Sequence, residues 1–521
     1  FGLITTNSIT QTFNRQVVAS HISRGTAFVF AIPDHPWVDS SDGAAVRIAM
    51  TVASRGGSVG ILATVSGEFP GDEHGTGVEL SPQKAVIHAD LTIGANVTDV
   101  SALQANRDLS FQGIIPLGDG FRLTREDFPR LGVNPSRLPL AVRRFVIGKD
   151  LVQVPQERHL IDFFGLTEEE ARSRFPALFQ HVLTTVKPER DHNRRDTRRK
   201  NWWLFGENAP KLRRATRSLA RTICTVETSK HKPFVFLPAD WDFDHKLYVV
   251  ASDDAFFLGV LSSRIHGTWA LAAGGRLGVG NDPTWTNTTC FLPFPFPATN
   301  EPTKTRIRKL AESLDAHRKA QQAAHPGLTV TGMYNVLEKL RSGDSLTAKE
   351  KTIHEQGLVS VLRQLHDDLD AAVFDAYGWP HDLTDEQILE RLVKLNAERA
   401  AEEARGLVRW LRPEFQAVGE KRKPAQVSLL PVGEAPEAPA GKGKKPARMP
   451  WPKAFPEQIA AIRNLLAQGD GVSVKTAAAA FNRADKEDLA ASLDALVALG
   501  LAVAFEVAGE RRWRLAGRVA A

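Results

Sequence analysis

Lysine, arginine and tryptophan are concentrated between residues 187 and 217. This segment holds eleven Lys or Arg residues against four acidic residues, so its net charge is +7 in a chain whose total is +6. Clustered cations bind DNA phosphates because each neutralised phosphate releases condensed counterions, and arginine can also bind a guanine edge. We therefore predict DNA contacts from the following residues: Arg194, Arg195, Arg198, Arg199, Lys200, Trp202, Trp203, Lys211, Arg213, Arg214 and Arg217.

A solvated helix face is the usual alternative for such a run of charges. Trp202 and Trp203 interrupt the run, and His192 and Asn193 lie close by, which favours contact with a nucleic acid. The prediction leaves open which side chain meets a base and which meets a phosphate.

Two other patterns are weaker candidates for chemistry. His231 and His245 lie near three aspartates within residues 240–244, but a metal site would need a second group of ligands at suitable spacing. The glycines of residues 274–280 resemble a phosphate-binding loop, although no strand is expected before them. We therefore assign no catalytic residue and no metal ligand to this chain.

The composition is that of an ordinary globular protein, with 42% hydrophobic and 24% charged residues. The sequence has no run of about 18 apolar residues and no signal segment, so we expect no membrane span. Cys224 and Cys290 are too few for a disulfide framework or a four-cysteine zinc site. We expect an intracellular, cytoplasmic protein without membrane association.

Patterns of strand-like, helix-like and proline-rich sequence divide the chain into six predicted parts. The predicted fold class is α/β at the N-terminus, as the remnant of a larger sheet, followed by an α+β domain, a helical region and a winged-helix-like module. The parts are 1–70 (end of an α/β sheet), 71–150 (connecting α+β segment), 151–300 (α+β domain rich in aromatic residues), 301–417 (helical), 418–450 (disordered linker with six prolines) and 451–521 (winged-helix-like module).

Two helices of the helical region have clear local signals. The apolar residues that follow Leu358 recur at spacings of three and four, and Gly378 predicts the end of that helix. A second helix is predicted over residues 385–407, because Thr384 and Gln387 form the pattern of a capping box.

The N-terminal motifs resemble those of a known enzyme family. Residues 1–9, FGLITTNSI, resemble the strand that follows the catalytic motif in γ-class amino-methylating DNA methyltransferases. Residues 34–37, Asp-His-Pro-Trp, followed by Asp-Gly-Ala-Ala-Val at 42–46, resemble the next motif of that family. The order of these segments along the chain strengthens the likeness.

Later segments resemble the same family, which includes type IIG restriction–modification enzymes and phage-defence methyltransferases. Residues 258–269 and 287–297, with their Ser-Ser pair and Phe-Pro-Phe-Pro exit, look like the end of the target-recognition domain. Residues 377–380, Tyr-Gly-Trp-Pro, look like the helical part that follows it. The resemblance covers about residues 1–410 and implies that residues 151–300 form the target-recognition domain.

The resemblance implies the chemistry of the parent enzyme, which transfers a methyl group from S-adenosylmethionine to the N6 amine of a flipped adenine. In that family an aromatic residue stacks on the flipped base, and Trp37 matches its position. The cofactor loop and the catalytic tetrapeptide precede the first matching strand in the family's order, and the chain starts with Phe1 inside that strand. We therefore expect the downstream part of a larger enzyme. Residues 282–285, Asp-Pro-Thr-Trp, resemble the tetrapeptide but lie in the recognition domain, so a structural or DNA-facing loop is preferred.

The prediction is therefore the C-terminal part of a site-specific DNA adenine-N6 methyltransferase, with double-stranded DNA as its partner. Further expected partners are a missing N-terminal catalytic half or subunits of a defence system. The alternative is a non-enzymatic specificity subunit that acts with a separate catalytic chain. A protein-interaction scaffold is a third possibility, and it would predict no DNA affinity at moderate salt.

Overall fold

The computed structural model describes two separate compact units, Phe1–Arg422 and Lys423–Ala521. The described residues are 1–10, 12–37, 47–57, 59–70, 76–277, 282–417, 449–451, 458, 461–462, 465–466, 472–482, 485–498, 502–507 and 510–515. Most of the predicted linker, residues 418–448, lies outside them. The last two residues of the predicted linker form β16 (Met449–Pro450), which pairs with β18 (Phe481–Asn482).

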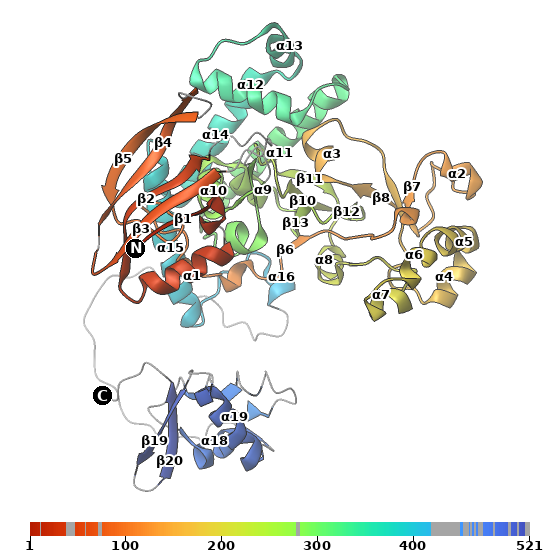
Figure 1. Cartoon of the computed structure of the whole chain (residues 1–521). Helices are drawn as coiled ribbons and strands as arrows, with labels where there is room; N and C mark the ends of the chain where they lie inside the picture. Colours follow the sequence, from red (N-terminus) through yellow and green to blue (C-terminus); the bar gives the residue numbers. More distant parts are fainter. Residues whose placement is uncertain are drawn as a thin grey trace. The chain divides into compact units, whose positions relative to one another are not determined.

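The first unit begins with a five-stranded sheet in the order β1-β3-β2-β4-β5 (Figure 1). Its neighbours are antiparallel except for β2 and β4, which run parallel. Residues such as Phe28 and Leu62 form a small core with Val18 and Ile22 of the helix that follows β1. The elements are β1 (Gly2–Thr6), α1 (Thr12–Ile22), β2 (Thr26–Pro36), β3 (Arg47–Arg55), β4 (Gly60–Pro70) and β5 (Thr76–Ala85).

Two further four-stranded sheets follow, with the orders β11-β10-β13-β6 and β12-β8-β9-β7. In the second sheet β12 runs parallel to β8, and it therefore joins a strand formed about a hundred residues earlier. The strands are β6 (Ser110–Gln112), β7 (Arg122–Leu123), β8 (Val142–Val146), β9 (His159–Ile161), β10 (Arg221–Val226), β11 (Val235–Pro238), β12 (Asp242–Phe243) and β13 (Leu247–Val250).

Short helices cover the second of these sheets. They enclose a core of aromatic residues that includes Phe121, Phe145, Phe179 and Trp202. Proline is the first or second residue of three of these helices, where a backbone N–H would have no helical partner anyway. The helices are α2 (Asp127–Arg130), α3 (Gly148–Val152), α4 (Glu168–Arg174), α5 (Pro176–Thr185), α6 (Lys187–Asp191), α7 (Asp196–Lys200) and α8 (Pro210–Thr216).

Longer helices form the largest core of the unit, around Trp269, Trp285 and Leu369. Trp269 and Trp285 are both fully buried, and the indole of Trp269 donates to the Cys290 carbonyl at 3.2 Å. The elements are α9 (Ala255–Ser262), α10 (Arg264–Ala273), β14 (Arg276–Leu277), β15 (Asp282–Pro283), a π-helical turn (Asn287–Phe291), α11 (Glu301–Ala324), α12 (Val330–Ser342), α13 (Ala348–Gln356), α14 (Val359–Tyr377), α15 (Asp385–Ala404) and α16 (Pro413–Gln416).

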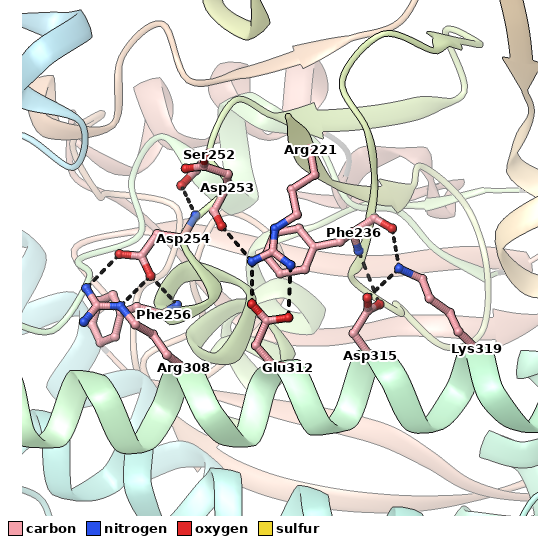
Figure 2. A network of polar contacts seen from close by, with 10 residues as sticks. All are labelled: Arg221, Phe236, Ser252, Asp253, Asp254, Phe256, Arg308, Glu312, Asp315 and Lys319. Carbon is pink, nitrogen blue, oxygen red and sulfur yellow. Dashed lines mark hydrogen bonds and ion pairs between the residues drawn. The ribbon is translucent and has the colours of Figure 1, made fainter. Parts of the chain in front are cut away.

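One face of α11 bonds to the edge strand β11 and to the elements beside it (Figure 2). Asp315 accepts from the Phe236 backbone N–H at 3.3 Å, and Lys319 donates to the Phe236 carbonyl at 2.6 Å. Glu312 pairs with Arg221 of β10. Side chains of α11 thus satisfy backbone groups that an edge strand would otherwise present to solvent.

The second unit contains a three-stranded sheet in the order β17-β20-β19 among its described residues. Leu489, Leu493, Phe481 and Trp513 form its core. The elements are β17 (Val472–Ser473), α18 (Val474–Ala480), α19 (Lys486–Ala498), β19 (Ala502–Val507) and β20 (Glu510–Leu515). β19 and β20 pair as an antiparallel hairpin, and most of residues 457–468 lie outside the described residues.

The expectation of a mixed α/β protein with several sheets and many helices is confirmed. None of the helices in the described part of the chain is long and apolar enough to cross a membrane.

Candidate nucleic-acid interface

A cavity of about 880 Å³ opens between α8, the start of β8 and the turn before β12. Three of the predicted DNA contacts line it: Arg213, Arg214 and Arg217. Two residues that were not predicted, Arg143 of β8 and Trp241, line it as well. The structure therefore brings the end of the basic segment together with a strand from a distant part of the sequence.

The floor of this cavity is a cluster of two arginines and two aspartates. The side chains of Asp162 and Asp242 are only 4% and 3% exposed. Arg213 donates to Asp162 at 2.7 Å and lies 3.2 Å from Asp242. The Nε of Arg143 lies 3.3 Å from Asp242. Two cations balance two anions, as burial of charge requires.

Burial and the neighbouring Asp162 carboxylate raise the pKa of Asp242, while both arginines oppose this shift. A proton on Asp242 would weaken its attraction to Arg143 and Arg213. The position of both guanidinium groups therefore depends on the ionised form of this buried aspartate.

The cations at the rim of the cavity differ from those in its floor. Arg214 and Arg217 are exposed, as is Lys211 one turn earlier on α8. No ion pair joins these three side chains to an acid in the described part of the chain. They are free to reach a ligand, and their long side chains carry positive charge toward solvent.

Several other predicted contacts are engaged within the protein. Arg198 pairs with Glu207 at 2.9 Å, and Arg195 lies 3.7 Å from the same carboxylate. Arg199 pairs with Asp196. The exposed ion pairs of this segment leave its net charge positive but reduce the number of free guanidinium groups. Arg194 and Lys200 remain exposed, without an ion pair among the described residues.

Arg190 belongs to the same basic run but is 1% exposed. Its Nη2 donates to the carbonyls of Pro116 at 2.9 Å and Leu204 at 3.2 Å. Burial lowers the pKa of Arg190. This residue holds the loop of 201–207 to the strand region at 116 and does not face a ligand.

The two predicted tryptophans lie inside the protein. Trp202 is 4% exposed and packs edge-to-face on Phe179, with ring centroids 5.3 Å apart. Trp203 is partly buried, and its indole donates to the Leu166 carbonyl at 3.0 Å. In this conformation the Trp202 ring lies in the core, and the DNA contacts expected of Trp202 and Trp203 stay a prediction.

Trp37 lies at the end of β2 and is 48% exposed. A second cavity, of about 700 Å³, is lined by Pro33 and Asp34 of the same strand and by Leu271 and Gly274 at the end of α10. Asp34 is held in place by Asn7, which donates to it at 2.7 Å. Residues 42–46 of the same motif lie outside the described residues.

The weaker candidates have structural partners. His231 lies 2.8 Å from the Asn335 side chain, and the described residues contain no group of three His, Cys, Asp or Glu side chains that could hold a metal ion. Burial raises the pKa of Cys224 to about 12, so this thiol is poorly suited to act as a nucleophile. Gly274 follows helix α10, not a strand, and Trp285 is buried in the core.

Two cavity residues that the sequence did not predict, Arg143 and Trp241, lie outside the basic segment of residues 187–217. The pairing of β12 with β8 places Asp242 opposite Phe145 and so brings Trp241 to the cavity that Arg143 and α8 also line. The Arg-Arg pair at 143–144 within a strand-like segment was the one local signal for this part of the cavity.

Comparison with known proteins places this cavity within a recognised domain. Residues 115–298 match the family described as "MmeI, target recognition domain". The solved structure of the type IIL restriction–modification enzyme MmeI in complex with DNA aligns with a TM-score of 0.59 and 19% identity, over 77% of this chain and 50% of that chain. Residues 115–298 are therefore similar to a target recognition domain of the MmeI type, and the match begins within the predicted connecting segment 71–150.

A curated relative supports the methyltransferase resemblance. DNA methyltransferase A of Bacillus subtilis (strain 168) is 28% identical over 167 residues, which are 32% of this chain and 16% of the relative. The chain thus spans half of the MmeI chain and a small share of this methyltransferase.

Proposed function

We propose that residues 115–298 bind double-stranded DNA at a particular sequence, as the recognition part of an adenine-N6 methyltransferase of a restriction–modification or phage-defence system. One observation carries the proposal: free cations surround a cavity with a fixed arginine in its floor, within a region that matches a target recognition domain. Phosphate contacts need mobile surface cations, whereas sequence reading needs donors at fixed positions.

In this proposal Arg214 and Arg217 bind phosphates at the rim of the cavity, and Lys211 of α8 binds another phosphate. Arg194 and Lys200 extend the same positive surface. Arg195, Arg198 and Arg199 add long-range attraction, although each already has an acidic neighbour. Binding of this kind weakens steeply as salt rises, because it depends on release of counterions.

Trp37 is proposed to stack on the adenine that is flipped out of the duplex. Its exposed ring at the end of β2 gives a base a π face that restores part of the lost stacking energy. S-adenosylmethionine would supply the methyl group in the parent enzyme. We expect that enzyme to be cytoplasmic. The glycines at 274 and 275 follow helix α10 and not a strand, so this segment lacks the strand–loop–helix arrangement of a nucleotide-binding loop.

Fluorescence anisotropy with the whole chain and labelled duplex DNA tests the proposal. Replacement of Lys211, Arg214 and Arg217 by Ala should weaken DNA binding. It should also make the negative slope of log K against log salt shallower by about 3, since each phosphate contact contributes about −0.9. The matched control replaces Lys349, Lys351 and Arg363, three exposed cations of α13 and α14, and should leave the slope unchanged. Equal slopes for the two triple variants would reject α8 as the contact surface.

A further inference from the structure

Arg143 differs from every other cation at the cavity, because the protein fixes its guanidinium group from one side. We propose that Arg143 is a specificity-determining residue that binds the hydrogen-bond acceptors of a base edge, and that Asp242, Asp162 and Arg213 are its positioning residues. The inference rests on the proposed DNA-binding function and names the residue that would read sequence within it.

The contacts of Arg143 leave part of its guanidinium group available. Its Nη2 donates to the Asp240 carbonyl, and its Nε lies 3.3 Å from Asp242 and 3.8 Å from Asp162. No acceptor for its Nη1 occurs within the described residues. The side chain is 29% exposed and lines the cavity, so Nη1 is the group left to meet a ligand.

Arg213 supports this arrangement from α8. Its Nε donates to the Asn208 carbonyl at 2.9 Å, its Nη1 donates to Asp162, and its Nη2 faces Asp242 at 3.2 Å. Its guanidinium also lies over the ring of Phe164, 4.7 Å from the centroid. With three partners of its own and a 15% exposed side chain, Arg213 is committed to the protein, and it locks the two aspartates that orient Arg143.

Burial of two aspartates is costly unless their geometry is good, and two hydrophobic residues could often fill such a site at no loss of stability. The cluster does supply one thing that hydrophobic residues cannot, a guanidinium group held at a fixed position before DNA arrives. A guanidinium group that is ordered before DNA binds loses less conformational entropy on binding. A fixed donor also discriminates between bases, because it cannot move to meet an acceptor in another position.

The chemistry of Arg143 selects its ligand. Arginine is a donor with no acceptor, so it fits bases that present acceptors in the major groove, and guanine with N7 and O6 presents the richest pair. Arg214 and Arg217 are exposed and have no ion pair among the described residues, so they lack this fixed geometry and suit phosphates. The cavity therefore divides into a fixed reading group in its floor and mobile phosphate-binding groups at its rim.

Selection of preferred duplexes from a randomised library, with the whole chain, tests the inference. The wild-type chain should select guanine at one position that Arg143→Lys no longer prefers, and the affinity of Arg143→Lys for the wild-type site should fall about 10- to 100-fold. The salt slope should not change, since lysine keeps the charge. The double variant Arg214→Ala, Arg217→Ala should show the opposite pattern. Its negative salt slope should be shallower by about 2, and its base preferences should be unchanged.

A change in the DNA keeps the test valid if Arg143→Lys folds poorly. 7-Deazaguanine at the selected position removes the N7 acceptor, and it should weaken binding of the wild-type chain about tenfold but leave Arg143→Lys almost unaffected. Loss of affinity at this analogue supports the inference. If guanine remains preferred by a folded Arg143→Lys, or if 7-deazaguanine binds the wild type as well as guanine does, the inference is overturned. A wild-type chain that selects no sequence at all would overturn the proposed function together with it.

Discussion

The indole Nε1 of Trp285 donates a hydrogen bond to Nε2 of His266, 3.3 Å away in the largest core of the protein. The Nδ1–H of the same imidazole donates a hydrogen bond to the Leu261 carbonyl, 2.8 Å away. Both ring nitrogens are therefore used by the neutral tautomer, and a second proton on Nε2 would face the Trp285 N–H. Burial accordingly lowers the pKa of His266 to about 4.

This relationship predicts a loss of stability at mildly acidic pH. The pKa of His266 in the folded protein lies below its ordinary value of 6.5, so the unfolded chain binds more protons between pH 6.5 and pH 4. Stability should fall as pH decreases through this window, by roughly 3 kcal/mol from this group alone. Urea unfolding followed by tryptophan fluorescence at several pH values should show a shallower pH dependence for His266→Gln. Parallel curves for the variant and the wild type would contradict this role of His266.

Arg190 and Arg194 belong to one basic run but should behave differently when each is replaced by alanine. Arg190→Ala removes a buried group with two carbonyl partners, so the free energy of unfolding should fall by about 2–4 kcal/mol while the salt slope of DNA binding stays constant. Arg194 is exposed, and Arg194→Ala should change stability by less than about 0.5 kcal/mol. Unfolding midpoints measured beside DNA titrations separate the two effects. A lower salt slope in a stable Arg190→Ala protein would show that the residue does contact DNA.

The polar side chains along α11 should contribute differently to the free energy of unfolding, according to their burial (Figure 2). Asp315 is 5% exposed, accepts hydrogen bonds from the Phe236 N–H and from Lys319, and lies 3.7 Å from Arg318. Asp315→Ala should therefore lower the free energy of unfolding by about 3 kcal/mol. Glu312 pairs with Arg221, but its side chain is 47% exposed, so Glu312→Ala should cost less than about 1 kcal/mol. Denaturant unfolding of both variants measures the difference. Equal losses would mean that the edge of β11 does not depend on Asp315.

Gly259 of α9 and Gly267 of α10 form a matched pair for testing the core. A Cβ on Gly259 would lie 2.5 Å from the Ile307 side chain of α11, so Gly259→Ala should destabilise the protein by about 1–3 kcal/mol. A Cβ on Gly267 would meet nothing within 4 Å, so Gly267→Ala should stabilise its helix by about 0.5–1 kcal/mol. Thermal unfolding should therefore move in opposite directions in the two variants. A neutral Gly259→Ala would indicate that α9 and α11 can separate at little cost.

Local signals predicted helices well. The capping box of Thr384 and Gln387 was confirmed at the start of α15, and the left-handed Gly378 ends α14 where the sequence predicted. These features depend on residues within one turn of each other, so the chain specifies them without help from distant contacts.

The arrangement of the candidate site could not be predicted in the same way. Asp162, Arg213 and Asp242 are separated by up to 80 residues in sequence. The pairing of β8 with β9 brings Asp162 to Arg143, the pairing of β12 with β8 brings Asp242, and α8 supplies Arg213. Burial also divides the basic run in a way that composition does not reveal, because Arg190 and Trp202 enter the core whereas Arg214 stays exposed. The charge of a segment predicts its attraction to DNA, and tertiary packing decides which of its side chains remain free.

The most direct test of the account is the ratio of two dissociation constants, measured with the whole chain at about 150 mM salt. One belongs to the duplex selected from a random library, and the other to a duplex of the same length and composition in shuffled order. The account predicts that the selected duplex binds at least about 1,000-fold more tightly, as for sequence-specific DNA-binding proteins. Equal affinities for the two duplexes would contradict it.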